Sequence, residues 1–216
     1  MENIFIILFG LSMIYISAIG RFRAHINMLA LQGILLFFIS LSGFMKENDA
    51  HILEIIFIVF ETLAVKSFII PLFLKKVMKK THAGRDTAAD IPHFYALVIS
   101  SIILFAGFMA ANIKLPEFQL ISPLYFGVSI AVIIISLWLI TIKHTVLSNV
   151  INFITMENGI FLLSLSAAQK MPVIINLGVL LDVFIAVFIL GMLVREINTQ
   201  FNDLEVSHIS ELKDYE

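Results

Sequence analysis

Long apolar runs, broken by short polar stretches, are the dominant pattern along this 216-residue chain. Each run is close to the roughly 20 residues that an α-helix needs to cross about 30 Å of hydrocarbon. None shows the alternation of apolar and polar positions that is typical of membrane β-strands. The pattern therefore predicts an all-α, polytopic membrane protein with about seven transmembrane helices, at residues 3–19, 26–45, 52–74, 93–113, 121–142, 149–168 and 172–194.

The composition excludes an ordinary soluble domain. Hydrophobic residues make up 60% of the chain and the mean hydropathy is +1.00, whereas soluble domains hold about 45–50% apolar residues. The lipid bilayer is therefore the expected surrounding, and no nucleic-acid partner is expected. The first run begins Met1-Glu2-Asn3 and lacks the positive charge that precedes the apolar core of a signal peptide. We interpret that run as a membrane helix.

Residues that could hold a cofactor are scarce. The chain has no cysteine, which excludes disulfides, thiolate-held iron–sulfur clusters and cysteine-based zinc sites within it. Its six histidines occur at the ends of runs, in connections and in the tail, without the spacing of a metal or haem site. We therefore expect no cofactor and no metal in this chain. Any redox centre has to belong to a partner.

Basic residues in the connections predict the orientation, because Lys and Arg are retained on the cytoplasmic side. With seven crossings, ten of them fall on one side of the membrane: Arg21, Arg23, Lys75, Lys76, Lys79, Lys80, Arg85, Lys143, Arg195 and Lys213. Three fall on the other side: Lys46, Lys114 and Lys170. The N-terminus is predicted outside and the C-terminus inside. The basic cluster at 75–80 also suits anionic lipid, and the acidic tail 196–216 suits either a soluble partner or disorder.

Polar positions repeat between the two halves of the chain. The matching positions are Asn27 and Gln32 in the second run, Asn152 and Glu157 in the sixth, Glu61 in the third and Asp182 in the seventh. Matching runs are separated by an even number of crossings, so the repeat is parallel rather than inverted. The pattern predicts two parallel three-helix units, 1–80 and 119–195. A loop and connector helix at 81–118 joins them, and the tail 196–216 follows.

Ionisable side chains in the middle of apolar runs are the candidate site: Glu61, Lys66, Glu157 and Asp182. Such residues are costly in a bilayer and mark ion pathways. We predict that these four carry an ion path, in which Glu157 and Asp182 face one internal, hydrated cavity. Uncharged polar residues are predicted to support it by orienting water: Gln32, Asn152 and Asn176.

A structural role is the alternative, in which Glu61 and Lys66 neutralise each other or Glu157 bonds a neighbouring helix. On an α-helix, however, residues five apart are about 140° apart in azimuth. Glu61 and Lys66 are therefore predicted to face different partners rather than to pair.

Two motifs carry a resemblance to a known family. The segment Met156-Glu157-Asn158-Gly159, followed by Gly178 to Val187, resembles hydrogenase-4 component E, a membrane subunit of formate-hydrogenlyase-type and related group 4 hydrogenase complexes. Lys66 to Pro71 and the tail Ile209 to Lys213 support the same resemblance over the whole length.

The second half is also similar to the small K-type subunit of respiratory complex I. That subunit has two membrane glutamates on its proton path. The resemblance implies that Glu157 takes the place of the glutamate in its second helix and Asp182 that in its third. Here the third-helix acid is the shorter aspartate.

The resemblance implies a non-catalytic membrane subunit of an ion-pumping redox complex in a bacterial or archaeal cell membrane, moving H⁺ or Na⁺. It also implies antiporter-like and quinone-channel-like membrane partners, and a cytoplasmic hydrogenase module that holds the nickel–iron and iron–sulfur centres. Two other functions stay open at this point. One is a component of a cation/proton antiporter without a redox module, and the other is a structural spacer between membrane subunits.

Overall fold

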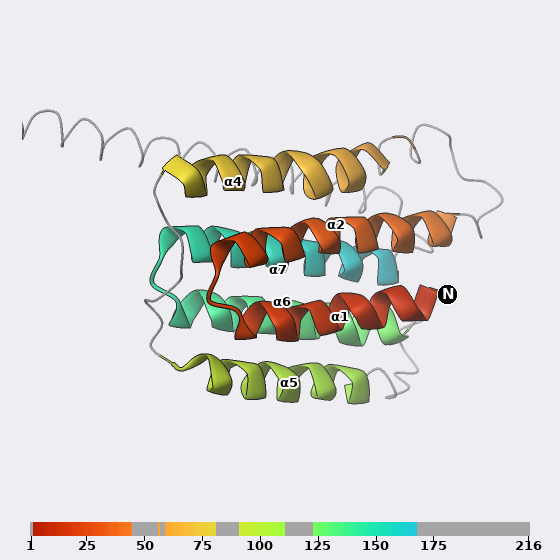
Figure 1. Cartoon of the computed structure of the whole chain (residues 1–216). Helices are drawn as coiled ribbons and strands as arrows, with labels where there is room; N and C mark the ends of the chain where they lie inside the picture. Colours follow the sequence, from red (N-terminus) through yellow and green to blue (C-terminus); the bar gives the residue numbers. More distant parts are fainter. Residues whose placement is uncertain (1, 45–55, 57–58, 81–90, 111–122, 168–216) are drawn as a thin grey trace, which may run out of the picture. The chain divides into compact units, whose positions relative to one another are not determined.

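The computed structural model describes residues 2–44, 56, 59–80, 91–110 and 123–167, which all belong to one compact unit, Met1–Val179. Every secondary-structure element assigned in this part of the chain is helical (Figure 1). The elements are α1 (Glu2–Ala18), α2 (Phe22–Phe44), the π-helix η1 (Phe60–Ile69), α4 (Ile70–Lys80), α5 (His93–Ala110), α6 (Pro123–Ile142) and α7 (Val146–Ala167).

Four of these helices are long and apolar enough to cross a membrane, over Phe22–Ser42, His93–Ala110, Pro123–Ile142 and Val146–Ser166, and α1 is a shorter apolar helix. The prediction of an all-α membrane protein is supported. The predicted segment 172–194 lies outside the described residues. The total of seven crossings and the two-unit repeat therefore stay predictions.

The third predicted run differs from the structure at its end. It was expected to end at residue 74, but α4 continues to Lys80. Lysine is a good helix former, and the helix therefore runs on through Lys75, Lys76 and Lys79 after the apolar residues end. Hydrophobicity marks where a helix enters the bilayer rather than where its hydrogen bonding stops.

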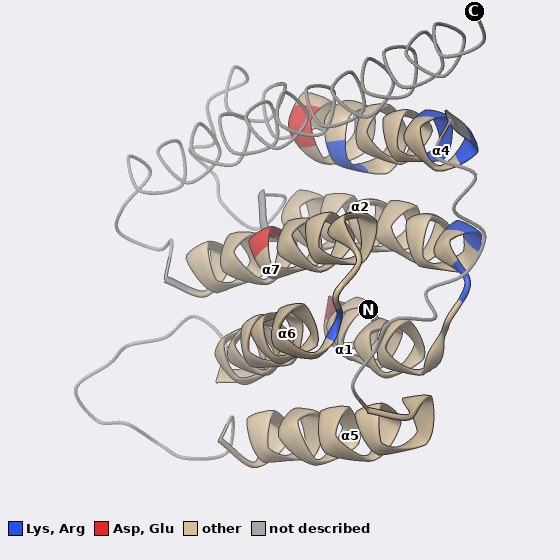
Figure 2. Ribbon diagram, turned by 90° about the vertical axis from the view of Figure 1, so that its left-hand side faces the viewer, with Lys and Arg blue, Asp and Glu red and all other residues tan. Residues whose placement is uncertain are grey.

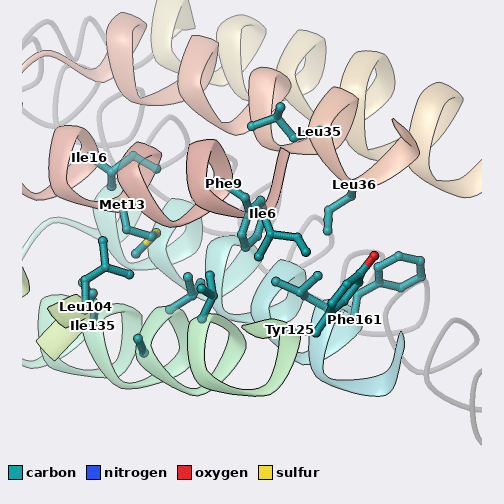
Figure 3. Close-up of a cluster of buried hydrophobic side chains, with 14 of the residues drawn as sticks. Ile6, Phe9, Met13, Ile16, Leu35, Leu36, Leu104, Tyr125, Ile135 and Phe161 are labelled. Carbon is teal, nitrogen blue, oxygen red and sulfur yellow. The ribbon is translucent and has the colours of Figure 1, made fainter. Parts of the chain in front are cut away.

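Helix packing joins the beginning of the chain to its later part. α1 packs against α2, α5 and α6, while α2 packs against α7, η1 and α4. The two hairpins α1–α2 and α6–α7 turn at the same end of the helices (Figure 1). In the core, α1 contributes Ile6, Phe9 and Met13, which meet side chains of α2, α5, α6 and α7 (Figure 3).

Close backbone contact holds α5 against α6. A Cβ atom at Gly107 would lie 2.6 Å from the carbonyl oxygen of Gly127 and 2.7 Å from the Cβ of Ala131. Lipid chains are as apolar as the side chains, so helices in a bilayer associate through such close packing at small residues. Only glycine fits at position 107 without moving the two helices apart.

Basic residues of the connections gather at the end of the helices that carries the two hairpin turns. Arg21 and Arg23 lie at the α1–α2 turn, Lys143 follows α6, and α4 ends in its lysines. Figure 2, which looks toward this end, shows basic segments at the end of α4, at the start of α2 and between α6 and α7. The positional rule predicts that this end is cytoplasmic, and the orientation stays a prediction.

A reporter active only in the cytoplasm, fused after Arg195, is expected to be active, because the charge bias predicts that the C-terminus lies inside. Its activity should be compared with that of a periplasmic reporter at the same position. A matched pair of fusions after Lys46 should give the opposite result. Activity of the external reporter after Arg195 would overturn the predicted orientation.

Candidate functional site

A buried ion pair is the first feature of the site. The Nζ atom of Lys66 lies 3.8 Å from Oε1 of Glu61, and the two side chains are 4% and 2% exposed. The prediction that these residues face different partners was wrong. It assumed α-helical geometry, whereas η1 is a π-helix, in which hydrogen bonds join residues five apart. The N–H of Ile70, for example, donates to the carbonyl of Val65, so side chains five apart follow each other on one face.

Pro71 is a sequence signal for this irregular helix. It lies directly after the hydrogen bond from Ile70 to Val65, as the second residue of α4. Proline has no N–H to donate and disturbs the turn before it. Helix distortions and π-type turns occur at such positions. The π-helix therefore ends where a regular hydrogen-bond ladder cannot run through unbroken.

The backbone of α2 lies against η1 at the level of Lys66. A Cβ atom at Gly33 would lie 2.9 Å from the backbone nitrogen of Ser67 and 3.0 Å from the carbonyl carbon of Lys66. The hydroxyl of Ser67 donates a hydrogen bond of 3.1 Å to the carbonyl of Ala30. The glycine and this hydrogen bond together fix the height and rotation of the lysine relative to α2.

Gln32, predicted as a supporting residue, is the centre of a polar connection between three helices. Its side-chain amide donates to the hydroxyl of Ser12 in α1 at 2.8 Å and contacts the sulfur of Met13. Its carbonyl oxygen accepts a hydrogen bond of 3.4 Å from the amide of Asn158 in α7. Gln32 is fully buried, and this network therefore holds α7 next to α2 at the residue that follows Glu157.

Asn158 and Phe161 were not among the predicted site residues. Asn158 could have been predicted from the sequence, because it is a polar residue in the Met-Glu-Asn-Gly segment, directly after Glu157. Phe161 could not, because a phenylalanine in an apolar run gives no polar signal. The ring of Phe161 nevertheless lies under the amine of Lys66, with Nζ 4.6 Å from the ring centroid.

Glu157 is buried in α7, with 2% of its surface exposed. Residues four apart on an α-helix lie on the same face, so Glu157 and Phe161 share a face one turn apart. The structure therefore brings Lys66 of η1 to within about one helical turn of the level of Glu157 on α7. Lys66 contacts α7 at Phe161, a residue that the pattern did not indicate.

Asn152 is a second buried amide of α7. It is 1% exposed, and within the described ranges neither its side-chain nitrogen nor its oxygen hydrogen-bonds to another protein group. Buried polar groups in proteins bind a partner or an ordered water. Its chemistry suits the water-orienting role that was predicted for it.

The remaining predicted residues, Asp182 and Asn176, lie outside the described residues, and the predicted pairing of Glu157 with Asp182 stays a prediction. Across residues 2–44, 59–80, 91–110 and 123–167, the structure has no group of three His, Asp or Glu side chains that could hold a metal ion.

Comparison with known proteins gives distant relatives. The chain is 27% identical over 202 residues to an uncharacterized protein of Mycobacterium tuberculosis, covering 89% of this chain and 86% of that protein. It is 25% identical over 155 residues to hydrogenase-4 component E of Escherichia coli K12, covering 68% of each chain, and the Shigella flexneri protein of that name matches equally. No family model matches, and no solved structure does.

The chain is similar to hydrogenase-4 component E. This similarity is distant. It gives loose support to the family that the motifs resemble. The resemblance of the second half to the K-type subunit of complex I stays a prediction.

Proposed function

We propose that this chain is a non-catalytic membrane subunit of a hydrogenase-like redox complex, and that it carries part of the ion path through the membrane. The observation that carries the proposal is the buried Glu61–Lys66 pair, whose amine also contacts α7 one turn from Glu157. The similarity to hydrogenase-4 component E supports the choice of complex. The nickel–iron and iron–sulfur centres belong to a cytoplasmic hydrogenase module, and the membrane partners are antiporter-like and quinone-channel-like subunits.

The energetics of the ion pair favour a functional role over a structural one. Taking two charges out of water costs several kcal/mol each, at order-of-magnitude level, and well-packed apolar residues of similar size are often as stable or more stable. A glutamate and a lysine inside an apolar bundle are therefore poor choices for stability alone. Ionisable residues in membrane segments instead serve ion pathways and proton relays.

The arrangement suits transfer between the two halves of the chain. Glu61 and Lys66 lie on η1, Glu157 lies on α7, and Gln32 on α2 connects to the neighbour of Glu157. In the proposed path an ion, H⁺ or Na⁺, moves along the carboxylates. The strength of the electrostatic attraction between the lysine ammonium and these carboxylates changes as the ion moves. Asn152 orients water at the α7 end, and Asp182 with Asn176 continues the path beyond Glu157.

Neutralising Lys66 tests this path. Lys66→Met alone leaves the Glu61 carboxylate without its buried cation. In comparable pairs this change lowers the free energy of unfolding by about 3–5 kcal/mol. The double variant Lys66→Met with Glu61→Gln removes both charges and is therefore expected to assemble as well as the wild type. We expect it to move at least about ten-fold fewer ions per hydrogen molecule turned over, since its path has lost both titrating groups.

Inside-out membrane vesicles with matched complex content provide the measurement, with hydrogen turnover and ion uptake recorded together. Wild-type ion uptake in the double variant would mean that the pair is only structural. A comparison of redox-driven with gradient-driven uptake separates the proposal from its rival, because an antiporter component without a redox module would support only the second. Genes for hydrogenase subunits next to the gene for this chain would favour the proposal.

A further inference from the structure

The contact between Lys66 and Phe161 joins two helices that are far apart in the sequence. The amine lies 4.6 Å from the ring centroid, inside the roughly 6 Å range of cation–π attraction. Both side chains are buried, with Phe161 3% exposed. The attraction is stronger at such desolvated positions than at the surface.

The ring acts on the ammonium in a way that a carboxylate cannot. Its negative face attracts a cation, yet it neither titrates nor accepts the proton. The Glu61 oxygen belongs to the same helix as the amine, η1, and lies 3.8 Å from it, longer than the roughly 2.7–2.9 Å of a charge-assisted hydrogen bond. The amine is thus held near α7 while its bond to the carboxylate of its own helix is loose.

The position of Phe161 along α7 relates its contact with Lys66 to Glu157. It follows Glu157 by four residues, on the same face and about 6 Å further along the helix axis. We infer that Phe161 is a positioning residue, which holds the Lys66 ammonium against α7 beside Glu157. Its effect on transport rests on the proposed function, whereas its contact with the amine does not.

Truncation alone is a poor test, because Phe161 also belongs to the hydrophobic core. Mono-, di- and trifluorinated phenylalanine, introduced at position 161, keep the shape of the ring and weaken its negative face step by step. We expect ion uptake to fall with each added fluorine, to about a tenth with the trifluorinated ring, in line with a desolvated cation–π contact. The same series at Phe9, a fully buried core ring of α1, is expected to have no trend.

Two further measurements separate this inference from the proposed function. The fluorine series should have no trend in the Lys66→Met, Glu61→Gln background, since the cation is gone. The ¹⁹F signal of the monofluorinated ring should also shift when Lys66 is replaced, whatever happens to ion uptake. A shifted signal with wild-type uptake in the Lys66 variants would keep the contact and reject the proposed function. Reduced uptake in those variants, together with a flat series at 161 and an unmoved ¹⁹F signal, would overturn the inference.

Discussion

Replacing Glu157 with glutamine is expected to leave the complex assembled and to lower ion translocation about a hundred-fold, the lower end of what a positioned proton-transfer group contributes. Glutamine keeps the size of the side chain and its hydrogen bonding but cannot titrate. Glu157 is buried on α7, which packs against both α2 and α6. Bulk water is therefore a poor substitute for its carboxylate.

Initial rates of ion uptake in vesicles with equal amounts of complex measure this effect. Glu2→Gln is the matched control: Glu2 lies at the start of α1, where it accepts a hydrogen bond from Tyr125, and glutamine can still accept that bond. Its uptake is expected to equal that of the wild type. Unchanged uptake in Glu157→Gln would reject Glu157 as part of the path.

The predicted pairing of Glu157 with Asp182 adds a second arm to this experiment. If both carboxylates face one cavity, they titrate as a unit. Glu157→Gln combined with Asp182→Asn should then cost much less than the sum of the two single losses, expressed as free energies. Additive losses would mean separate sites.

Gly33→Ala is expected to damage both stability and transport. Its Cβ would meet the backbone of Lys66 and Ser67 at 2.9–3.1 Å, and backbone atoms cannot turn away as a side-chain end can. α2 and η1 would have to separate, with loss of the bond from Ser67 to Ala30 and displacement of the lysine. Such overpacking lowers the free energy of unfolding by about 1–3 kcal/mol.

Thermal unfolding of the purified protein in detergent, together with ion uptake in vesicles, measures both effects. Gly10→Ala is the matched control, because its Cβ would meet only the side-chain ends of Leu104 and Val128, at 3.1 and 3.2 Å. These ends can shift by a few tenths of an ångström. Equal behaviour of the two variants would contradict the tight approach of α2 to η1.

The helices could be predicted from the sequence because an apolar run of about 20 residues has few other stable forms. The ion pair could not. A five-residue spacing separates two side chains on an α-helix but brings them together on a π-helix, and the hydrophobic pattern does not distinguish these two hydrogen-bond ladders. Pro71 was the local sign of the irregular helix.

The candidate site was predicted in part for a similar reason. Polar residues stand out in an apolar run, so Gln32, Lys66 and Glu157 could be singled out from the sequence, and the structure places all three in buried positions on α2, η1 and α7. Their role in an ion path stays a prediction. The contribution of Phe161 depends on its distance from a cation on another helix. That distance depends on how the helices pack, and the hydrophobic pattern of one apolar segment does not indicate it.

Purification of the tagged chain from its native membrane, in mild detergent, tests the central claim most directly. We expect subunits of a nickel–iron hydrogenase and antiporter-like membrane subunits to be identified with it by mass spectrometry, and we expect the preparation to turn over hydrogen. A preparation that contains this chain with transporter subunits alone, and neither redox subunits nor hydrogen turnover, would contradict this claim.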